Sequence, residues 1–445
     1  MANSRRFDID GKILVDMPPG WKQSCVGDEV DFSRKPRNCE ITSDTEVPFM
    51  PMDLLPDSGL YATRWIPRKG KELSSGVFFN DGDILLAKIT PCLQNGKQGI
   101  ARGIPGGWGF ATTEVYAIRP RSLNTEFLAL YFRDQDVRKW LADKLQGATG
   151  RQRLPKEALT SLGVPVPPPD EQRAIIHVLR TVQRAKEATG NVLAAARQLK
   201  RSLMRHLFTY GPVPFDEVEN VELRQSDIGT KPEQWQEEEL ANITDIVYGV
   251  QAAVAHNTDP KIGIPILTNI NITIDGTCDL GTLRYYDLPE QRRDKLILKK
   301  GDVLFNWRSG SEDHVGKTAM FSHEGDFTFS SFILRFRSKG RIENEYLYYC
   351  LSSLKADGFF AHYRAQSSVN SVFNASAAAK VPIAFPGKKE RAAIVMALQA
   401  IDRKLAAETN RYKSLEALVD SLIHNLMTGQ VHVHELGLSI PAEVS

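Results

Sequence analysis

An internal repeat with an offset of about 219 residues constrains this chain more than any other feature of its sequence. A period of this length is too long for a solenoid unit and indicates a duplicated module. Trp21 and Trp235 stand near the starts of the two copies, at a slightly smaller offset. The matching segments are Gly82-Asp83-Ile84-Leu85 with Gly301-Asp302-Val303-Leu304, Gly96-Lys97 with Gly316-Lys317, Thr112-Thr113 with Ser330-Ser331, Glu126-Phe127-Leu128 with Glu345-Tyr346-Leu347, and Glu171, Ala174-Ile175-Ile176 and Leu179 with Glu390, Ala393-Ile394-Val395 and Leu398.

The first part of each copy, about 165 residues, has the pattern of an α+β globular domain. Short apolar or alternating runs separated by Gly, Pro, Asn and Asp predict strands. The expected strands are Asp83–Ala87 and Glu114–Arg119 in the first copy, and Asp302–Asn306 and Phe332–Arg337 in the second. One or two helices should follow in each copy, over Thr125–Leu145 and Asn344–Tyr363.

The second part of each copy predicts one long helix. The first helix follows a proline-rich breaker that ends at Pro169, with Asp170 as its N-cap, and stops at Gly211. The second helix follows Pro386-Gly387 and stops at Gly429. The expected organisation is a globular domain over 1–169, a helix over 170–211, a linker over 212–231, a second globular domain over 232–386, a helix over 387–429 and a C-terminal tail over 430–445.

Both helices carry apolar residues at alternating steps of three and four, which predicts a coiled-coil seam interrupted at Thr189 and Glu408. The alternative is that each helix packs only on its own domain. The fold class predicted is therefore α+β, with two similar domains separated by two long antiparallel helices that form a coiled coil, in a pseudo-twofold internal repeat. The seam residues are Ile175, Val178, Val182, Ala185, Val192, Ala196, Leu199 and Leu203 in the first helix, and Ile394, Leu398, Ile401, Leu405, Tyr412, Leu415, Val419, Leu422 and Leu426 in the second.

The segment Val164-Pro-Val-Pro-Pro-Pro-Asp-Glu-Gln-Arg-Ala-Ile-Ile176 resembles the start of the central helical region of type I restriction-modification specificity subunits. The Gly-Asp-Ile/Val-Leu strand with a later Gly-Lys resembles their target-recognition domains. The second copy departs from the pattern, because Phe385–Glu390 lacks the proline run and the Gln. The resemblance covers nearly the whole chain.

This resemblance implies a DNA-binding subunit in which each target-recognition domain reads one half of a bipartite site in double-stranded DNA. It also implies two modification subunits that use S-adenosylmethionine to methylate adenine N6, and restriction subunits that need ATP and Mg²⁺. The helices of such a subunit set the spacer between the half-sites and dock the modification subunits. No cofactor is expected in this chain itself.

Motifs for catalysis are missing from the sequence. It contains neither the Asn/Asp-Pro-Pro-aromatic motif of an amino-methyltransferase nor a P-loop. The segment Gly103–Gly109 is interpreted as a turn, Asp8–Lys12 as an N-terminal strand, and His432 and His434 as part of an exposed tail rather than a metal site. Five scattered cysteines without a C-x-x-C pair, no apolar run long enough to span a membrane and no signal-peptide pattern favour a cytoplasmic protein.

The candidate DNA-binding residues are polar and basic side chains on two loops of each copy, since Arg, Lys, Asn and Gln read base edges. The alternative for each is an ordinary polar surface residue. The net charge of the chain is only +2, and residues 212–386 carry 18 Lys and Arg against 24 Asp and Glu, so a focused basic surface is required there. The candidates are Lys88, Gln94, Asn95, Lys97, Gln98, Arg102, Arg151, Gln152 and Arg153 in the first copy, and Asn306, Trp307, Arg308, Ser309, Ser311, His314, Lys317, Gln366, Ser367, Ser368 and Asn370 in the second.

Two other function classes remain open at this point. One is a non-catalytic scaffold with paired interaction domains, which the acidic second domain favours. The other is a free-standing enzyme that acts on DNA, against which the missing motifs argue. Salt-sensitive binding to a bipartite duplex would exclude the scaffold, because phosphate contacts release counterions.

Overall fold

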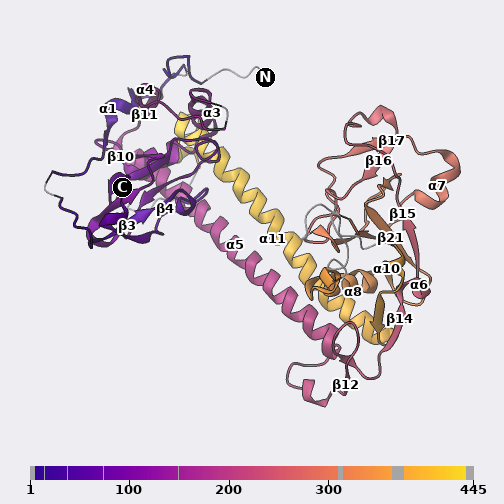
Figure 1. Cartoon of the computed structure of the whole chain (residues 1–445). Coiled ribbons are helices and arrows are strands. Elements are labelled where there is room, and N and C mark those ends of the chain that lie inside the picture. Colours follow the sequence, from indigo (N-terminus) through magenta and orange to yellow (C-terminus); the bar gives the residue numbers. More distant parts are fainter. Residues whose placement is uncertain are drawn as a thin grey trace. The chain divides into compact units, whose positions relative to one another are not determined.

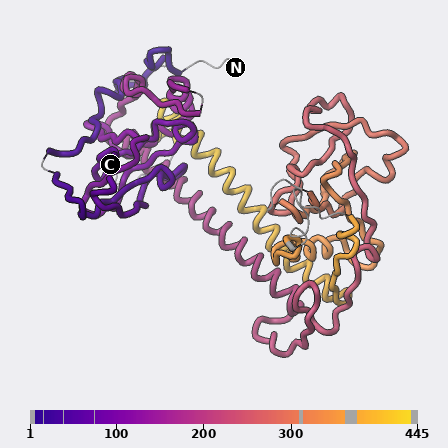
Figure 2. Tube along the Cα trace, in the orientation of Figure 1, coloured from indigo at the N-terminus to yellow at the C-terminus, as the bar shows by residue number. Residues whose placement is uncertain are grey.

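The computed structural model describes residues 6–14, 16–37, 39–73, 75–148, 150–308, 314–362 and 375–436. It divides into two compact units, and each is described by itself. The first comprises residues 1–191 and 409–445, and the second comprises residues 192–408. The C-terminal half of the last helix, coloured yellow, therefore belongs to the same unit as the indigo N-terminal residues (Figure 2).

The first unit is built on two antiparallel-rich sheets. A five-stranded sheet has the order β2-β10-β7-β8-β4, and a four-stranded sheet has the order β5-β3-β9-β6. A short pair, β1 with β11, joins the start of the domain to the segment before the first long helix. The strands are β1 (Lys22–Cys25), β2 (Val30–Phe32), β3 (Glu46–Met50), β4 (Tyr61–Ala62), β5 (Ile66–Lys69), β6 (Val77–Asn80), β7 (Ile84–Ala87), β8 (Gln98–Ala101), β9 (Trp108–Ala111), β10 (Val115–Pro120) and β11 (Gly163–Val166).

The short α-helices among the described residues of this domain are α1 (Val26–Glu29), α2 (Thr125–Tyr131), α3 (Gln135–Asp143) and α4 (Lys156–Ser161). The helical region predicted after β10, as one or two helices, consists of two, because Asp134 interrupts it and caps α3 through the backbone N–H groups of Asp136 and Val137. The core lies between these helices and the five-stranded sheet, with Phe127 and Tyr131 among its fully buried side chains.

The second unit has a related plan with a four-stranded sheet of order β15-β21-β18-β19 and a three-stranded sheet of order β17-β16-β20. Its strands are β12 (Leu223–Arg224), β13 (Lys231–Pro232), β14 (Gln236–Glu239), β15 (Thr244–Tyr248), β16 (Ile264–Leu267), β17 (Arg284–Tyr286), β18 (Val303–Asn306), β19 (Thr318–Met320), β20 (Thr328–Phe329), β21 (Ile333–Ser338) and β22 (Pro382–Phe385). Its short helices are α6 (Leu240–Ile243), α7 (Glu290–Leu296), α8 (Asn344–Ala356), α9 (Phe359–His362) and α10 (Ala375–Ala379).

Equivalent contacts stabilise the two units, and this set of shared contacts is called here the frame. Asp83 accepts a bond from Arg119 at 2.9 Å, and Asp302 accepts two from Arg337 at 2.6 Å. Both carboxylates also accept a backbone N–H from three residues earlier, so each Gly-Asp motif closes a turn as well as an ion pair. The motif that marked the repeat in the sequence therefore has a structural role.

A second shared contact ties each domain to its long helix. The indole Nε1 of Trp21 donates to Glu171 at 2.7 Å, and that of Trp235 donates to Glu390 at 3.0 Å. The Gln missing from the second copy is replaced by Arg391. Gln172 bonds the Pro167 carbonyl in the first unit, and Arg391 bonds the Pro386 carbonyl in the second.

The long helices are α5 (Pro169–Tyr210) and α11 (Lys388–Thr428). Within each unit their segments lie side by side and run in opposite directions (Figure 1). In the first unit Lys186 pairs with Glu416 at 2.7 Å, and in the second Lys200 pairs with Asp402 at 2.6 Å. Apolar side chains of both helices belong to the core of each unit, among them Leu179 and Ile423 in the first and Met204 and Leu398 in the second.

The predicted seam of α5 is wrong at two positions. Val192 is 42% exposed and Leu199 is 56% exposed, whereas Leu193, one residue further, is buried. The side chains that lie toward α11 include Lys186, Thr189 and Lys200, which a search for apolar residues passes over. In α11 every predicted seam residue is buried or half-buried, and Glu408, expected as an interruption, is buried as well.

The expected linker and tail both contribute to the cores. Ile228 and Lys231, from the segment expected as a linker, are buried in the second unit. Val433 is buried in the first unit, and His432 bonds Glu171 at 2.8 Å, so residues 430–436 are not the exposed tail that the sequence predicted. Asp8–Lys12 forms a turn closed by the Asp8 carboxylate rather than a strand.

Candidate nucleic-acid interface

The two loops proposed for the first copy meet in the structure. The backbone N–H of Thr90 donates to the carbonyl of Gln152 at 3.0 Å, and the N–H of Gln152 donates to the Thr90 hydroxyl at 3.0 Å. The N–H of Leu154 donates to the carbonyl of Lys88 at 2.7 Å. Residues 88–95 and 151–153 therefore form one surface where β7 ends, called here the first loop surface.

Its side chains differ in how free they are to bind a ligand. Gln94, Asn95 and Arg151 are exposed, and no acidic partner of Arg151 is found among the described residues. Arg153 is instead paired with Glu114, donating at 2.7 and 2.9 Å, and this hydrogen bond holds the pKa of Glu114 below its usual range. Lys88 lies over the Tyr116 ring at 5.0 Å. Arg151 is thus the cation best placed to meet a phosphate.

Three candidates of the first copy do not belong to this surface. Gln98 is 1% exposed and donates to the Ala129 carbonyl at 2.7 Å, because it points into the core from β8, an inner strand of the five-stranded sheet. Lys97 donates to the carbonyls of Met52 and Leu55 and pairs with Asp57, which fastens a neighbouring loop. Arg102 is exposed but follows β8, at the opposite end of the β7–β8 hairpin from Lys88.

Two candidates of the second copy are also structural. Asn306 is fully buried, and its side-chain amide donates to the His314 carbonyl at 2.8 Å. Lys317 is 5% exposed and donates to the Asn269 carbonyl at 3.1 Å, and burial lowers its pKa. Lys317 thus repeats in the second unit the loop-fastening contact that Lys97 makes in the first. The Gly-Lys pair of the repeat is part of the frame.

Aromatic side chains dominate the described part of the equivalent surface in the second unit. Trp307 donates from Nε1 to the Ser331 carbonyl at 2.7 Å and packs edge-on against Tyr248 at 5.5 Å. Arg308 lies over the Phe332 ring at 5.8 Å, and His314 is exposed. Ser309, Ser311, Gln366, Ser367, Ser368 and Asn370 lie outside the described residues.

Sequence reasoning missed Tyr248 and Phe332. Their side chains are 43% and 41% exposed, which is unusual for large aromatic residues at the ends of strands. Each lies outside the loops with the most polar residues, so only the pairing of β15 with β21 and of β21 with β18 brings them beside Trp307. Aromatic residues at the ends of predicted strands were the signal in the sequence that could have identified Tyr248 and Phe332 as candidates. The second loop surface comprises Tyr248, Trp307, Arg308, His314 and Phe332.

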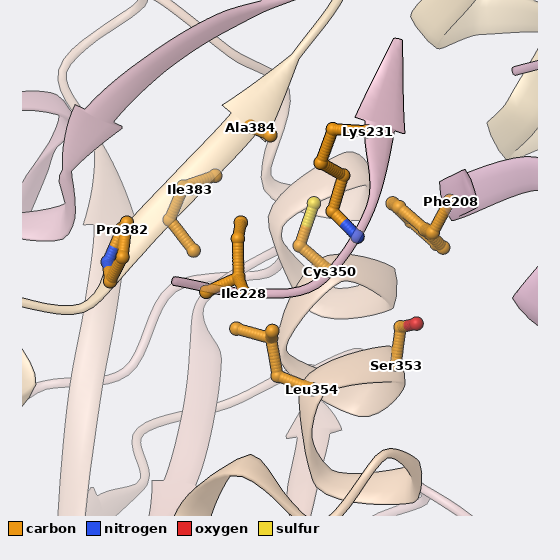
Figure 3. A pocket seen from close by; sticks show the side chains of 9 residues that line it. All are labelled: Phe208, Ile228, Lys231, Cys350, Ser353, Leu354, Pro382, Ile383 and Ala384. Carbon is orange, nitrogen blue, oxygen red and sulfur yellow. The ribbon is translucent and has the colours of Figure 1, made fainter. Parts of the chain in front are cut away.

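A small pocket in the second unit is lined by none of these residues (Figure 3). Lys231 from β13 points its ammonium group toward Phe208, Cys350 and Ser353. Burial lowers the pKa of Lys231 and raises the pKa of the Cys350 thiol to about 12. A thiol with this pKa is not a thiolate nucleophile at neutral pH. The pocket therefore lacks an activated nucleophile of this kind.

None of the described helices is long and apolar enough to cross a membrane. The glycine-rich segment after β8 forms a turn, with Gly106 and Gly107 at φ of 72° and 75°. It is therefore a connection between β8 and β9 and does not lead from a strand into a nucleotide-binding helix.

The chain matches the family model described as the type I restriction modification DNA specificity domain, over residues 18–195 and again over 232–417. It is 28% identical over 197 residues to the Type I restriction enzyme EcoAI specificity subunit of Escherichia coli, covering 42% of this chain and 33% of that one. A second specificity subunit of Escherichia coli, EcoEI, matches over 27% of its length, so the chain spans a third or less of these two relatives.

Longer matches extend over nearly the whole chain. The Type I restriction enzyme MjaVIII specificity subunit of Methanocaldococcus jannaschii is 20% identical over 440 residues, covering 94% of this chain and 95% of that one. The crystal structure of a type I restriction-modification system S subunit from M. genitalium has the same fold, with a TM-score of 0.55 at 14% identity, covering 93% of this chain and 98% of that one.

Proposed function

The chain belongs to the type I restriction modification DNA specificity family, and from this we propose that it reads a bipartite sequence in double-stranded DNA. One target-recognition domain would contact each half-site. One observation carries the proposal: the two units share a frame of equivalent contacts but present different side chains at the same place on it. A common frame with different loop surfaces suits a protein that reads two different half-sites.

The first loop surface supplies the kinds of group that direct readout of DNA needs. Gln94 and Asn95 are exposed amides of the type that pair with adenine, and Arg151 suits guanine or a phosphate. The second loop surface offers Arg308 and His314 beside exposed aromatic rings, which suit the thymine methyl group and stacking. The two half-sites would therefore differ in sequence.

We further propose that α5 and α11 form one antiparallel coiled coil with pseudo-twofold symmetry, which sets the spacer between the half-sites. The ion pairs within each unit support this. The step along α5 from Lys186 to Lys200 has the same length as the step back along α11 from Glu416 to Asp402. Equal steps in opposite directions are the register expected for one continuous antiparallel pair. Helices of 42 and 41 residues are each about 60 Å long.

The partners proposed are two modification subunits and, where the system restricts DNA, restriction subunits. S-adenosylmethionine, ATP and Mg²⁺ would be bound by those partners, and this chain would be a non-catalytic subunit. Adenine-N6 methylation would then depend on this chain for its site and on the modification subunits for its chemistry.

The first experiment is a readout of methylated adenines by long-read sequencing, with the chain co-expressed with the modification subunits encoded beside it. Wild-type protein should give a bipartite motif with a fixed spacer. The double variant N95A/R151A should weaken or change one half of the motif only, while K139A, an exposed change on α3, should leave it intact. A motif unaffected by N95A/R151A would remove the first loop surface from the proposal.

Binding to a labelled duplex carrying that motif tests the scaffold alternative. The affinity should fall steeply with salt concentration, and R151A should reduce the slope by about 1 if Arg151 contacts one phosphate. Salt-independent or undetectable binding by the assembled complex would instead favour a scaffold with paired interaction domains.

A further inference from the structure

Three side chains with metal-binding groups come together in the first unit, and none of them belongs to the first loop surface. Asp134 and Asp136 lie at the start of α3, and His424 lies near the end of α11. One ligand atom from each residue lies within 4.8 Å of the other two. The cluster therefore joins the recognition domain of this unit to the last turns of its long helix.

The distances within the cluster are too long for hydrogen bonds. His424 Nδ1 lies 3.4 Å from Asp134 Oδ2 and 3.7 Å from Asp136 Oδ2, whereas N–H···O bonds are typically about 2.7–3.2 Å long. Two ligand atoms bound about 2.1 Å from one cation at a tetrahedral angle lie about 3.4 Å apart. The separation of His424 Nδ1 from Asp134 Oδ2 therefore equals that of two donors bound to one ion.

A buried acceptor without a partner gives a second, independent indication. The Asp134 side chain is 0% exposed, and its Oδ2 has no hydrogen-bond partner among the described residues. Its other oxygen, Oδ1, accepts the N–H groups of Asp136 and Val137 and lies 3.0 Å from the Arg6 guanidinium. A buried carboxylate oxygen left without a partner is costly, so Oδ2 needs a partner of its own although Arg6 already balances the charge at Oδ1.

We propose that Asp134, Asp136 and His424 bind a first-row divalent cation, with Zn²⁺ as the representative ion. One imidazole nitrogen and two carboxylate oxygens suit Zn²⁺, whereas Mg²⁺ and Ca²⁺ prefer oxygen ligands alone. A water molecule completes the fourth position. Asp136 and His424 are 44% and 40% exposed, which gives the ion access from solvent.

Such an ion has a defined structural consequence within this unit. Direct polar contacts between the described residues of α3 and the end of α11 are weak, since Gln135 donates to Asp420 at 3.3 Å and His424 lies beyond hydrogen-bond distance. The buried Arg6 links the two indirectly, because it lies 3.0 Å from Asp134 and donates to the Met427 carbonyl at 3.1 Å. A bound cation would replace these with two strong bonds from α3 and one from α11. The end of α11 would thereby be fixed on the domain that it adjoins.

The test is isothermal titration of the metal-free full chain with ZnCl₂. Wild-type protein should bind one Zn²⁺ ion, and H424A and D136N should each weaken that binding at least tenfold. A parallel titration with MgCl₂ should show no binding at this site. Asp134 is left unchanged because it caps α3, so its substitution would alter the fold.

The matched control is H432A, which removes a second histidine that also contacts a carboxylate in the same unit. It should leave the Zn²⁺ affinity unchanged. Co²⁺ bound to the wild type should give the visible absorption of a tetrahedral complex, and H424A should lose it. Zinc retained by H424A and D136N, or lost in H432A instead, would overturn the proposal whatever the DNA-binding results.

Discussion

The replacement of Gln172 by Arg391 at matching positions of the two units gives the sharpest test of the shared frame. In the first unit Gln172 donates to the Pro167 carbonyl at 2.9 Å and accepts the N–H of Asn124 at 2.8 Å. In the second unit Arg391 donates to the Pro386 carbonyl at 2.8 Å and to the Glu343 carboxylate at 2.7 and 3.3 Å. Asn124 and Glu343 occupy matching positions, so a bond from a backbone N–H to a Gln side chain in one unit corresponds to a side-chain ion pair in the other.

The variant R391Q removes both bonds to Glu343 and keeps one bond to the Pro386 carbonyl. A charge-assisted hydrogen bond contributes about 1.5–3 kcal/mol, and breaking a buried ion pair costs about 3–5 kcal/mol. Arg391 is 9% exposed, but Glu343 is 40% exposed and regains water when its partner is lost. We therefore expect R391Q to destabilise the second unit by about 2 kcal/mol.

The double variant E343N/R391Q introduces the residues of the first unit, in which the Gln accepts the backbone N–H of the Asn, and should recover more than half of that loss. Native-state hydrogen exchange of the amides at the start of α11 measures the effect locally, which avoids assuming two-state unfolding of a two-unit chain. The double-mutant cycle supplies the coupling energy. An R391Q effect below about 0.5 kcal/mol, or no recovery in the double variant, would refute the equivalence of these positions.

Contacts described above in both units give three further predictions. The hydrogen bond from Arg391 lowers the pKa of Glu343, so the associated stability should be present above about pH 4.5 and lost as the pH falls below it. Urea midpoints measured from pH 3 to 7 should show this loss of stability in acid for the wild type and a smaller loss for E343Q. L193A should lower the free energy of unfolding by about 2–3 kcal/mol because Leu193 is buried, whereas L199A should lower it by less than about 0.5 kcal/mol. Equal changes in the thermal midpoints of the two variants would instead support the heptad predicted from the sequence. D302N should lower the stability of the second unit by about 3 kcal/mol in urea unfolding, since Asp302 is buried and accepts two bonds from Arg337, while D326N, on an exposed pair, serves as its control.

The sequence by itself determined the family, the two α+β domains and the extents of the long helices to within a residue or two. Each of these follows from local or repeated signals. Helix ends depend on breakers such as Pro386 and Gly429, and strands depend on apolar runs bounded by turn residues. A duplication doubles such signals, because each copy can be checked against the other.

Tertiary structure decided which side chains face inward. Val192 and Leu199 are apolar yet exposed, whereas Lys186 and Lys200 face inward and meet Glu416 and Asp402. A pattern of apolar residues has no means of anticipating an ion pair formed with a helix more than two hundred residues away.

The same limit applies to the candidate interface. Gln98, Asn306 and Lys317 have the composition of DNA-binding residues, but neighbouring strands and loops cover them and their polar groups bond backbone carbonyls. Tyr248 and Phe332 are exposed beside Trp307 only because three strands pair in one sheet. Residue type indicates what a side chain can bind, whereas burial, which depends on distant parts of the chain, decides whether it can reach a ligand.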